Sequence, residues 1–241
     1  PPSTHAVMIF MVSVLPRSLF AVPRYEVSTM PATAALTALE ALPRGELNFD
    51  IGTNVRMNAV EAEPRVFRES MDVTQGKLGM GFACGSDDYA AALMGNTLFG
   101  GSSNSKLFLN VREKLSLCYY ASSTLEKMKG LILVSSGIEF DKFQQARDEI
   151  LHQLEEIRQG NMEDWELEGA RSTLLNAYAS MGDSQGKLEN FYLGQAATGQ
   201  EDTPELLAEQ VRHVTAERIF DAMQTVSLDT VYFLKGKETA E

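Results

Sequence analysis

The sequence predicts an α+β fold, in which an antiparallel sheet carries helices packed on one of its faces. Residues 72–84 alternate in the manner of a strand, and residues 117–124 and 130–138 form two more strand-like segments. A short charged turn joins the latter two segments, which indicates antiparallel pairing. Helical patterns follow from residue 141 onward, and residues 229–235 close the domain as a last strand.

The composition argues against several classes of ligand. The chain has 241 residues, of which 44% are hydrophobic, and its formal net charge is −12. The hydrophobic fraction supports a packed core. Nucleic acids and anionic membrane surfaces attract clustered Lys and Arg, so the charge argues against both as partners. Cys84 and Cys118 lie in strand-like segments as small hydrophobes, and two cysteines form no disulfide framework, so we expect a cytoplasmic location.

The N-terminal part of the chain predicts one strand and one helix. Residues 5–15 are expected to form a buried strand, because this apolar run lacks a basic segment before it and is too short to cross a bilayer as a helix. Residues 32–42 predict a helix, and the polar residues 46–65 predict a loop or linker. The chain has no initiator Met, so we expect it to be part of a longer product.

The alternating pattern of the first strand of the main domain predicts which of its side chains face the core. Leu78, Met80 and Phe82 point to one side of a strand with a period of two. Ser86 or Asp87 is expected to cap the helix that follows.

The clearest helix spans residues 141–159, and Gly160 follows it as a C-cap. Further helices are predicted to start near Asp164, at Pro204 and after the capping residue Thr215, and another covers residues 187–197. The apolar residues of the clearest helix recur at three and four positions, which predicts a buried face made of Phe143, Ala146, Ile150, Leu154 and Ile157.

Residues 100–120 combine a pair of glycines, a short helix and a strand. Gly100 and Gly101 permit backbone angles that other residues resist, and they predict a flexible loop. Asn104 or Ser105 can cap the helix that follows. Helical spacing predicts a buried stripe on this helix, made of Leu107, Phe108, Val111 and Leu115.

Two interpretations of this stretch follow from its residues alone. The first is a packed helix and strand with a surface arginine, Arg112, which lies seven residues before Tyr119. The second is an anion cradle, in which glycines and a helix N-terminus present free N–H groups. The spacing disfavours the cradle, because Lys106 follows Ser105, whereas in a Walker loop the Lys precedes the Ser or Thr.

The same stretch resembles the second repeat of the insulinase/pitrilysin family of zinc peptidases. That family carries a Gly-Gly loop, a Ser-x-Leu-Phe helix, and an Arg seven residues before a Tyr. The sequence matches with Gly-Gly-Ser-Ser-Asn-Ser-Lys-Leu-Phe from residue 100 and Val-Arg-Glu-Lys-Leu-Ser-Leu-Cys-Tyr from residue 111. The resemblance extends from about residue 72 to residue 235. It implies that residues 1–45 are the tail end of a preceding repeat, residues 46–71 a linker and residues 72–241 the non-catalytic repeat domain.

The catalytic motif of that family is missing. Its peptidases bind zinc with His-x-x-Glu-His on a helix, where the two His are ligands and the Glu polarises a zinc-bound water. The three histidines here, His5, His152 and His213, are too scattered to form it. The run from residue 92 to residue 100 aligns with the zinc helix by its Leu-Phe-Gly ending. The resemblance therefore implies a non-catalytic half, with the three motif positions occupied by Ala92, Gly95 and Asn96.

Other candidate sites are weaker. His152 and Glu156 are four apart on one helix, which a metal could use, but we expect a solvated helix face instead. His213 is expected to be a cation at a helix C-terminus. A serine nucleophile is unsupported, because no His lies near the serines of the glycine loop, Ser102, Ser103 and Ser105.

The resemblance implies a role for Arg112 and Tyr119. In the family these residues reach from the non-catalytic half toward substrate bound at the zinc of the catalytic half. We therefore expect this chain to be inactive alone, to hold no metal itself, and to pair with a zinc-carrying catalytic half or to self-associate. The alternatives are a structural subunit that keeps the fold without any part in proteolysis, and then a free-standing enzyme with an unrecognised site.

Overall fold

The computed structural model describes residues 32–43, 63–127, 129–198 and 200–236. The strand expected in residues 5–15 lies outside these ranges, and so does most of the linker expected in residues 46–71. The described part of the chain contains no helix that is long and apolar enough to cross a membrane.

The smaller of two compact units comprises Pro1–Thr53 and Tyr178–Pro204. Its described helices are α3 (Ala32–Glu40), the short 3-10 helix η5 (Met181–Asp183) and α7 (Gln185–Thr198). Helix α3 confirms the helix predicted for residues 32–42, and α7 confirms the helix predicted for residues 187–197.

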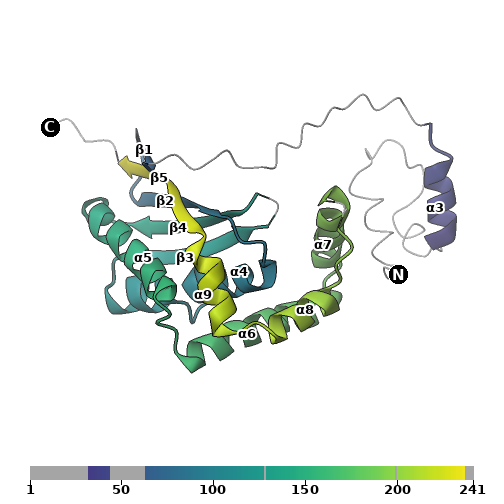
Figure 1. The fold of residues 1–241 in the computed structure, drawn as a ribbon. Helices are drawn as coiled ribbons and strands as arrows, with labels where there is room; N and C mark the ends of the chain where they lie inside the picture. Colours follow the sequence, from purple (N-terminus) through teal and green to yellow (C-terminus); the bar gives the residue numbers. More distant parts are fainter. Residues whose placement is uncertain (1–31, 44–62, 128, 199, 237–241) are drawn as a thin grey trace. The chain divides into compact units, whose positions relative to one another are not determined.

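The larger unit, Asn54–Ala177 and Glu205–Glu241, is built on a five-stranded sheet with the strand order β1-β5-β2-β4-β3 (Figure 1). Strand β2 pairs antiparallel with both β4 and β5, and β3 pairs antiparallel with β4. Strand β1 pairs parallel with β5, so the sheet is mixed. The α+β class is confirmed. The strands are β1 (Arg65–Met71), β2 (Gly76–Cys84), β3 (Cys118–Glu126), β4 (Leu131–Ile138) and β5 (Val226–Gly236).

Strand β1 corrects the predicted linker, because residues 65–71 of that range form an edge strand. All seven of its side chains are exposed, so the strand has no buried face that would give an alternating apolar pattern. Backbone pairing with β5 holds it, together with an ion pair between Arg65 and Asp229 at 2.6 Å and a hydrogen bond of 2.6 Å from the Tyr232 hydroxyl to Glu69.

The sheet buries one face beneath helices, and Figure 1 shows α4, α5 and α9 on that side. Leu78, Met80 and Phe82 are buried there, as predicted. The edge of the Phe82 ring meets the Phe99 ring at a centroid distance of 6.1 Å. This face therefore forms the hydrophobic core of the larger unit.

Helix α4 (Tyr89–Asn96) is capped by Asp88, whose Oδ1 accepts the Ala91 N–H at 3.1 Å. The predicted cap at Ser86 or Asp87 is therefore wrong by one or two positions. The Ser86 hydroxyl instead accepts the backbone N–H of Asp88 at 3.2 Å, which places it just before the helix.

The later helices follow the predicted pattern. The five residues predicted as the apolar face of α5 are all buried, Gly160 has the left-handed φ of 79° expected of a C-cap, and Pro204 is the first residue of α8. The Thr215 hydroxyl accepts the Arg218 N–H at 3.3 Å, as its predicted capping role requires. The elements are η4 (Phe140–Lys142), α5 (Phe143–Arg158), α6 (Asp164–Ala179), α8 (Pro204–Arg212) and α9 (Ala216–Gln224).

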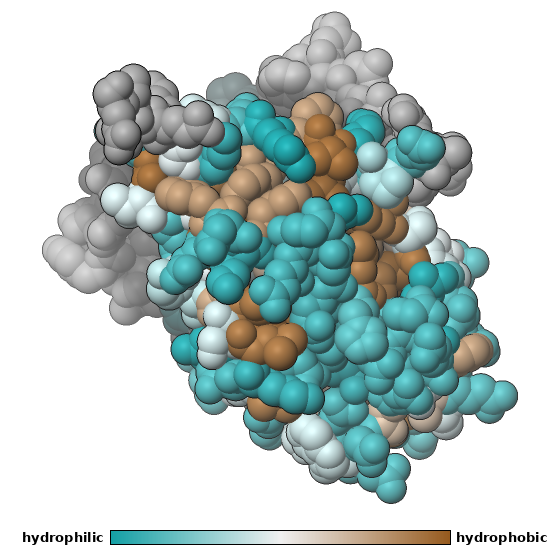
Figure 2. Space-filling model, turned by 90° about the vertical axis from the view of Figure 1, so that its left-hand side faces the viewer, coloured by the Kyte–Doolittle hydropathy of each residue, from teal (hydrophilic) through white to brown (hydrophobic). Residues whose placement is uncertain are grey.

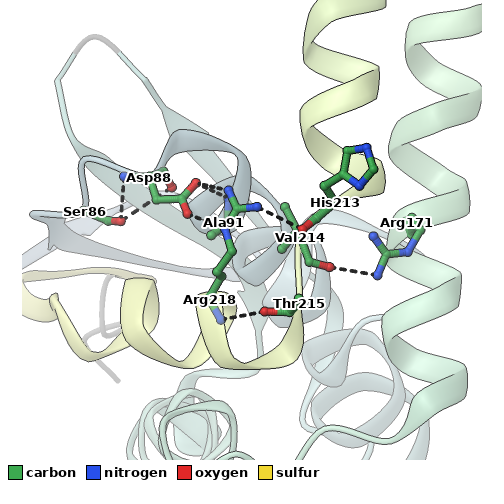
Figure 3. A network of polar contacts seen from close by, with 8 residues as sticks. All are labelled: Ser86, Asp88, Ala91, Arg171, His213, Val214, Thr215 and Arg218. Atoms are coloured by element: carbon green, nitrogen blue, oxygen red, sulfur yellow. Dashed lines mark hydrogen bonds and ion pairs between the residues drawn. The ribbon is translucent and has the colours of Figure 1, made fainter.

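Two arginines fasten the connection between α8 and α9 (Figure 3). Arg171 on α6 donates to the carbonyl of Val211 in the last turn of α8 at 2.7 Å and to that of Val214, after α8, at 3.0 Å. Arg218 on α9 makes two hydrogen bonds, of 2.8 and 2.9 Å, to the carboxylate of Asp88 before α4. The guanidinium of Arg218 holds the pKa of Asp88 below its usual value.

Large apolar side chains remain on the surface of the larger unit. Val66, Phe67 and Met71 of β1 are exposed, and so is Phe140 after β4. Figure 2 shows patches of exposed hydrophobic residues between hydrophilic ones, on the side of the molecule where β1 and α5 lie in Figure 1.

Candidate substrate-binding site

The glycine pair before the site forms no flexible loop. Gly100 and Gly101 end the π-helical turn η2 (Thr97–Gly101), and neither has a positive φ. A Cβ on Gly100 would lie 2.7 Å from the backbone nitrogen of Ser123 on β3. The predicted loop is therefore wrong, and the absence of a side chain at Gly100 instead lets this turn touch strand β3.

The helix that carries Arg112 is η3 (Leu107–Lys114), which also has π-helical hydrogen bonding. Leu107 and Val111 of the predicted stripe are buried, but Phe108 is only half-buried and Leu115 is 41% exposed. The prediction assumed α-helical spacing, whereas i→i+5 bonding places fewer turns in the same length and rotates later residues off the stripe. The Leu115 N–H bonds the Asn110 carbonyl, five residues back, at 3.0 Å.

The start of η3 is anchored in the interior. The Ser105 hydroxyl accepts the Phe108 N–H at 3.4 Å, which supports one of the two predicted caps. The Lys106 ammonium donates to both carboxylate oxygens of Glu166 at 2.9 and 3.0 Å, and both side chains are buried. Glu166 Oε2 also accepts the backbone N–H of Glu163, so it caps α6 at the same time.

The structure brings the two predicted site residues together. Arg112 Nε donates a 3.0 Å hydrogen bond to the backbone carbonyl of Tyr119. The guanidinium lies over the Phe108 ring, 4.7 Å from its centroid, and Nη1 lies 3.2 Å from a carboxylate oxygen of Glu113. These contacts fix the plane of a guanidinium that remains partly exposed to solvent.

Tyr119 lies in an irregularity of β3, where the pairing with β4 shifts between Cys118 and Tyr120. An extra residue of this kind re-aims a side chain, and the Tyr119 side chain is 58% exposed. Its hydroxyl lies 3.5 Å from Glu139 Oε1, a weak contact that leaves the group available to a ligand. Burial raises the pKa of the neighbouring Cys118 thiol, which disfavours a thiolate nucleophile here.

Sequence reasoning missed Phe108 and Glu139 as neighbours of this pair. Phe108 was expected in the core, because α-helical spacing was assumed for η3. Glu139 is 20 residues from Tyr119 and meets it only because β3 and β4 pair. Knowledge of the register between β3 and β4 would have predicted that Glu139 lies near Tyr119.

The three positions aligned with the zinc motif face the interior. Ala92, Gly95 and Asn96 are all buried on α4. A Cβ on Gly95 would lie 2.4 Å from the Met223 sulfur of α9, so packing between these helices occupies the space beside Gly95. Within the described ranges, no three His, Cys, Asp or Glu side chains are grouped so that they could hold a metal ion.

The remaining candidates are surface residues with ordinary contacts. His152 is exposed on α5, and the Glu156 carboxylate accepts a hydrogen bond of 3.2 Å from Asn161. His213 directly follows α8, and its Nε2 lies 2.8 Å from Glu209 Oε1. The Ser102 hydroxyl bonds the Thr97 carbonyl at 3.4 Å. None of these contacts forms a metal or nucleophile site.

The fold and site together define a peptidase-like α+β domain whose three zinc-motif positions hold Ala92, Gly95 and Asn96 and which presents an arginine–tyrosine pair. The comparisons with known proteins agree with this class. The peptidase M16 inactive domain matches residues 38–174. The probable inactive metalloprotease YmfF of Bacillus subtilis (strain 168) is 39% identical over 184 residues, which are 75% of this chain and 43% of that protein.

Solved structures show the same fold. A conserved protein from Enterococcus faecalis V583 has a TM-score of 0.69 and 30% identity, over 77% of this chain and 45% of its own. A peptidase M16 inactive domain from Pseudomonas fluorescens has a TM-score of 0.61 and 20% identity, over 74% of this chain and 45% of its own. This chain belongs to the peptidase M16 inactive-domain family, which confirms the resemblance noted for residues 100–120. It spans less than half the length of these relatives.

Proposed function

We propose that this chain is the non-catalytic half of a zinc peptidase and contributes Arg112 and Tyr119 to a composite peptide-hydrolysis site. The observation that carries the proposal is the bond from Arg112 Nε to the Tyr119 carbonyl, which holds both residues at one partly exposed place. Two findings support a role other than zinc chemistry for this chain. It belongs to the inactive-domain family, and the three buried positions aligned with the zinc motif carry no His or Glu side chain.

The two side chains have complementary roles in this proposal. The free N–H groups of Arg112 clamp a carbonyl or carboxylate of the bound peptide. The Tyr119 hydroxyl donates to the oxyanion that forms when water attacks the scissile carbonyl. That water and its zinc belong to the catalytic half, whose residues lie outside this chain.

The partner in this proposal is a catalytic half of similar size. The relatives are more than twice as long as the part that matches this chain, so they have room for a second domain. Residues 72–241 with β1 would then form the non-catalytic repeat, and residues 1–45 the tail of the preceding one. The cytoplasmic location expected from the two cysteines is part of the same proposal.

The test is steady-state hydrolysis of a fluorogenic peptide by this chain together with a His-x-x-Glu-His protein that copurifies with it. Tyr119→Phe removes one hydroxyl and should lower kcat by about a hundred- to a thousandfold if that hydroxyl binds the oxyanion. Arg112→Ala should mainly raise KM, because a clamp on the bound peptide acts before the transition state. Complex formation is measured alongside by light scattering.

The matched control is Tyr232→Phe, because the Tyr232 hydroxyl also lies near a carboxylate, that of Glu69. It should leave kcat unchanged. If Tyr119→Phe and Arg112→Ala both leave kcat and KM unchanged in an intact complex, the composite site is wrong. The structural-subunit alternative would then be favoured, in which Arg112 and Tyr119 serve only their contacts within the domain, with Glu113 and Glu139 respectively.

A further inference from the structure

Three residues form a row across the strands beside Tyr119. Lys77 of β2 pairs with Gly137 of β4, and Gly137 pairs with Tyr120 of β3. Residues directly opposite each other in a sheet point to the same face. This is the face opposite the core, because the neighbours Leu78 and Ile138 are the buried ones.

Gly137 allows the Tyr120 ring to lie across the row. A Cβ at Gly137 would be 2.6 Å from Tyr120 Cε1 and 3.0 Å from Cδ1. The Tyr120 hydroxyl lies 3.4 Å from Ser135 Oγ on the same strand as Gly137. The Lys77 ammonium lies 5.3 Å from the centroid of the ring, within the range of a cation–π contact. The row is therefore a preformed aromatic platform with one cation above it.

Among the described residues, Lys77 has no carboxylate as an ion-pair partner. Its hydrogen bond of 2.6 Å goes to the neutral Gln75 Oε1, and none of the ion pairs formed within the described ranges includes it. The carboxylate at this end of β4, Glu139, instead lies near the Tyr119 hydroxyl. In a chain with a net charge of −12, Lys77 is therefore an exposed cation that makes no ion pair with the residues that the structure describes.

We propose that Lys77 and Tyr120 form a subsite for a carboxylate of the bound peptide, beside Tyr119 on strand β3. The inference rests on the proposed function in taking the ligand to be a peptide and Arg112 to be its clamp. Arg112 holds the main chain, while Lys77 supplies the charge and Tyr120 the flat surface for the adjoining residue. The carboxylate belongs either to an Asp or Glu side chain or to the peptide C-terminus, since both present the same group.

The experiment measures direct binding, without a catalytic partner. Fluorescein-labelled decapeptides are titrated with the full chain and followed by fluorescence anisotropy. One peptide has two central Glu residues, a second has Gln in their place, and each is made with a free and with an amidated C-terminus. The Glu peptides are expected to bind tighter than the Gln peptides if side chains supply the carboxylate. The free-acid forms are expected to bind tighter if the C-terminus does.

Variants assign the preference to the row. Lys77→Gln should reduce the preference about two- to fivefold, the range of an exposed ion pair. Lys129→Gln is the matched control, because Lys129 is also exposed and lies in the turn at the opposite end of the sheet. Gly137→Ala should weaken binding of the same peptide without changing any charge, because its Cβ displaces the Tyr120 ring. Thermal unfolding of each variant checks that it is folded.

Equal affinity for all four peptides overturns the proposal, and so does a Lys77→Gln effect no larger than that of Lys129→Gln. Unchanged binding by Gly137→Ala removes Tyr120 from the subsite. The outcome is separable from the composite site, because it requires no hydrolysis. Charge-selective binding that depends on Lys77 would stand even if Tyr119→Phe left kcat unchanged.

Discussion

The buried ion pair between Lys106 and Glu166 gives the sharpest test of how the site is held. The two side chains are only 9% and 7% exposed, so water cannot replace a lost partner. Lys106→Met leaves the Glu166 carboxylate buried with one N–H partner, that of Glu163. Removing one partner of a buried pair costs about 3–5 kcal/mol. For a chain of this length we expect the thermal midpoint to fall by about 10 °C.

A double-mutant cycle measured by urea unfolding isolates the pair. Glu166→Gln keeps an oxygen for the Glu163 N–H, so the double variant loses both charges and keeps the cap. We expect the double variant to be more stable than Lys106→Met alone, because no unpaired charge remains. Arg212→Met, which breaks the exposed pair with Glu209, is the control and should barely move the midpoint. A loss under about 1 kcal/mol for Lys106→Met, or simple additivity of the two changes, would refute the reasoning.

Two further predictions concern packing and acid stability. Gly100→Ala places a Cβ 2.7 Å from the Ser123 nitrogen and should lower the free energy of unfolding by about 1–3 kcal/mol in urea; Gly186→Ala, with nothing within 4 Å, should not. The lowered pKa of Asp88 means that its bond to Arg218 stabilises the fold above its ordinary pKa of 3.8 and is lost as the pH falls through the lowered value. Asp88→Asn keeps the cap but loses the charge, so its urea midpoint should lie below that of the parent at pH 7. The gap should narrow as the pH falls below 3.8 and close once the pH is below the lowered pKa of Asp88, and a gap that does not change with pH would contradict this.

Much of the fold could be predicted because its elements bury one face. Apolar residues alternate in β2 and recur every three or four positions in α5, because one side of each element faces the core. Both predicted faces are buried. Strand β1 could not be found in this way, because every one of its side chains is exposed. Its place in the sheet depends on pairing with β5, which no local pattern records.

The candidate site was predictable only in part. A short motif placed Arg112 and Tyr119, and the structure brings them together. Lys77 and Tyr120 were not predicted as site residues, because their proximity depends on the register of β2, β4 and β3. It also depends on Gly137, which lies between them and has no side chain to separate them. The two glycines before the site were misjudged for a related reason: their role is close contact with other backbone, which sequence alone does not distinguish from flexibility.

The parallel pairing of β1 with β5 also governs the order in which the larger unit can fold. Strand β1 comes first in this sheet, yet its neighbour is the strand made last, and Arg65 is paired with Thr230. During synthesis β1 leaves the ribosome before β5 has been made. It stays unpaired until more than 150 further residues have been synthesised. Closing so long a loop is slow, so completion of the sheet should be a late event in folding. A chain that ended before β5 would lack the strand that pairs with β2 on one side and β1 on the other, so β1 could not join the sheet.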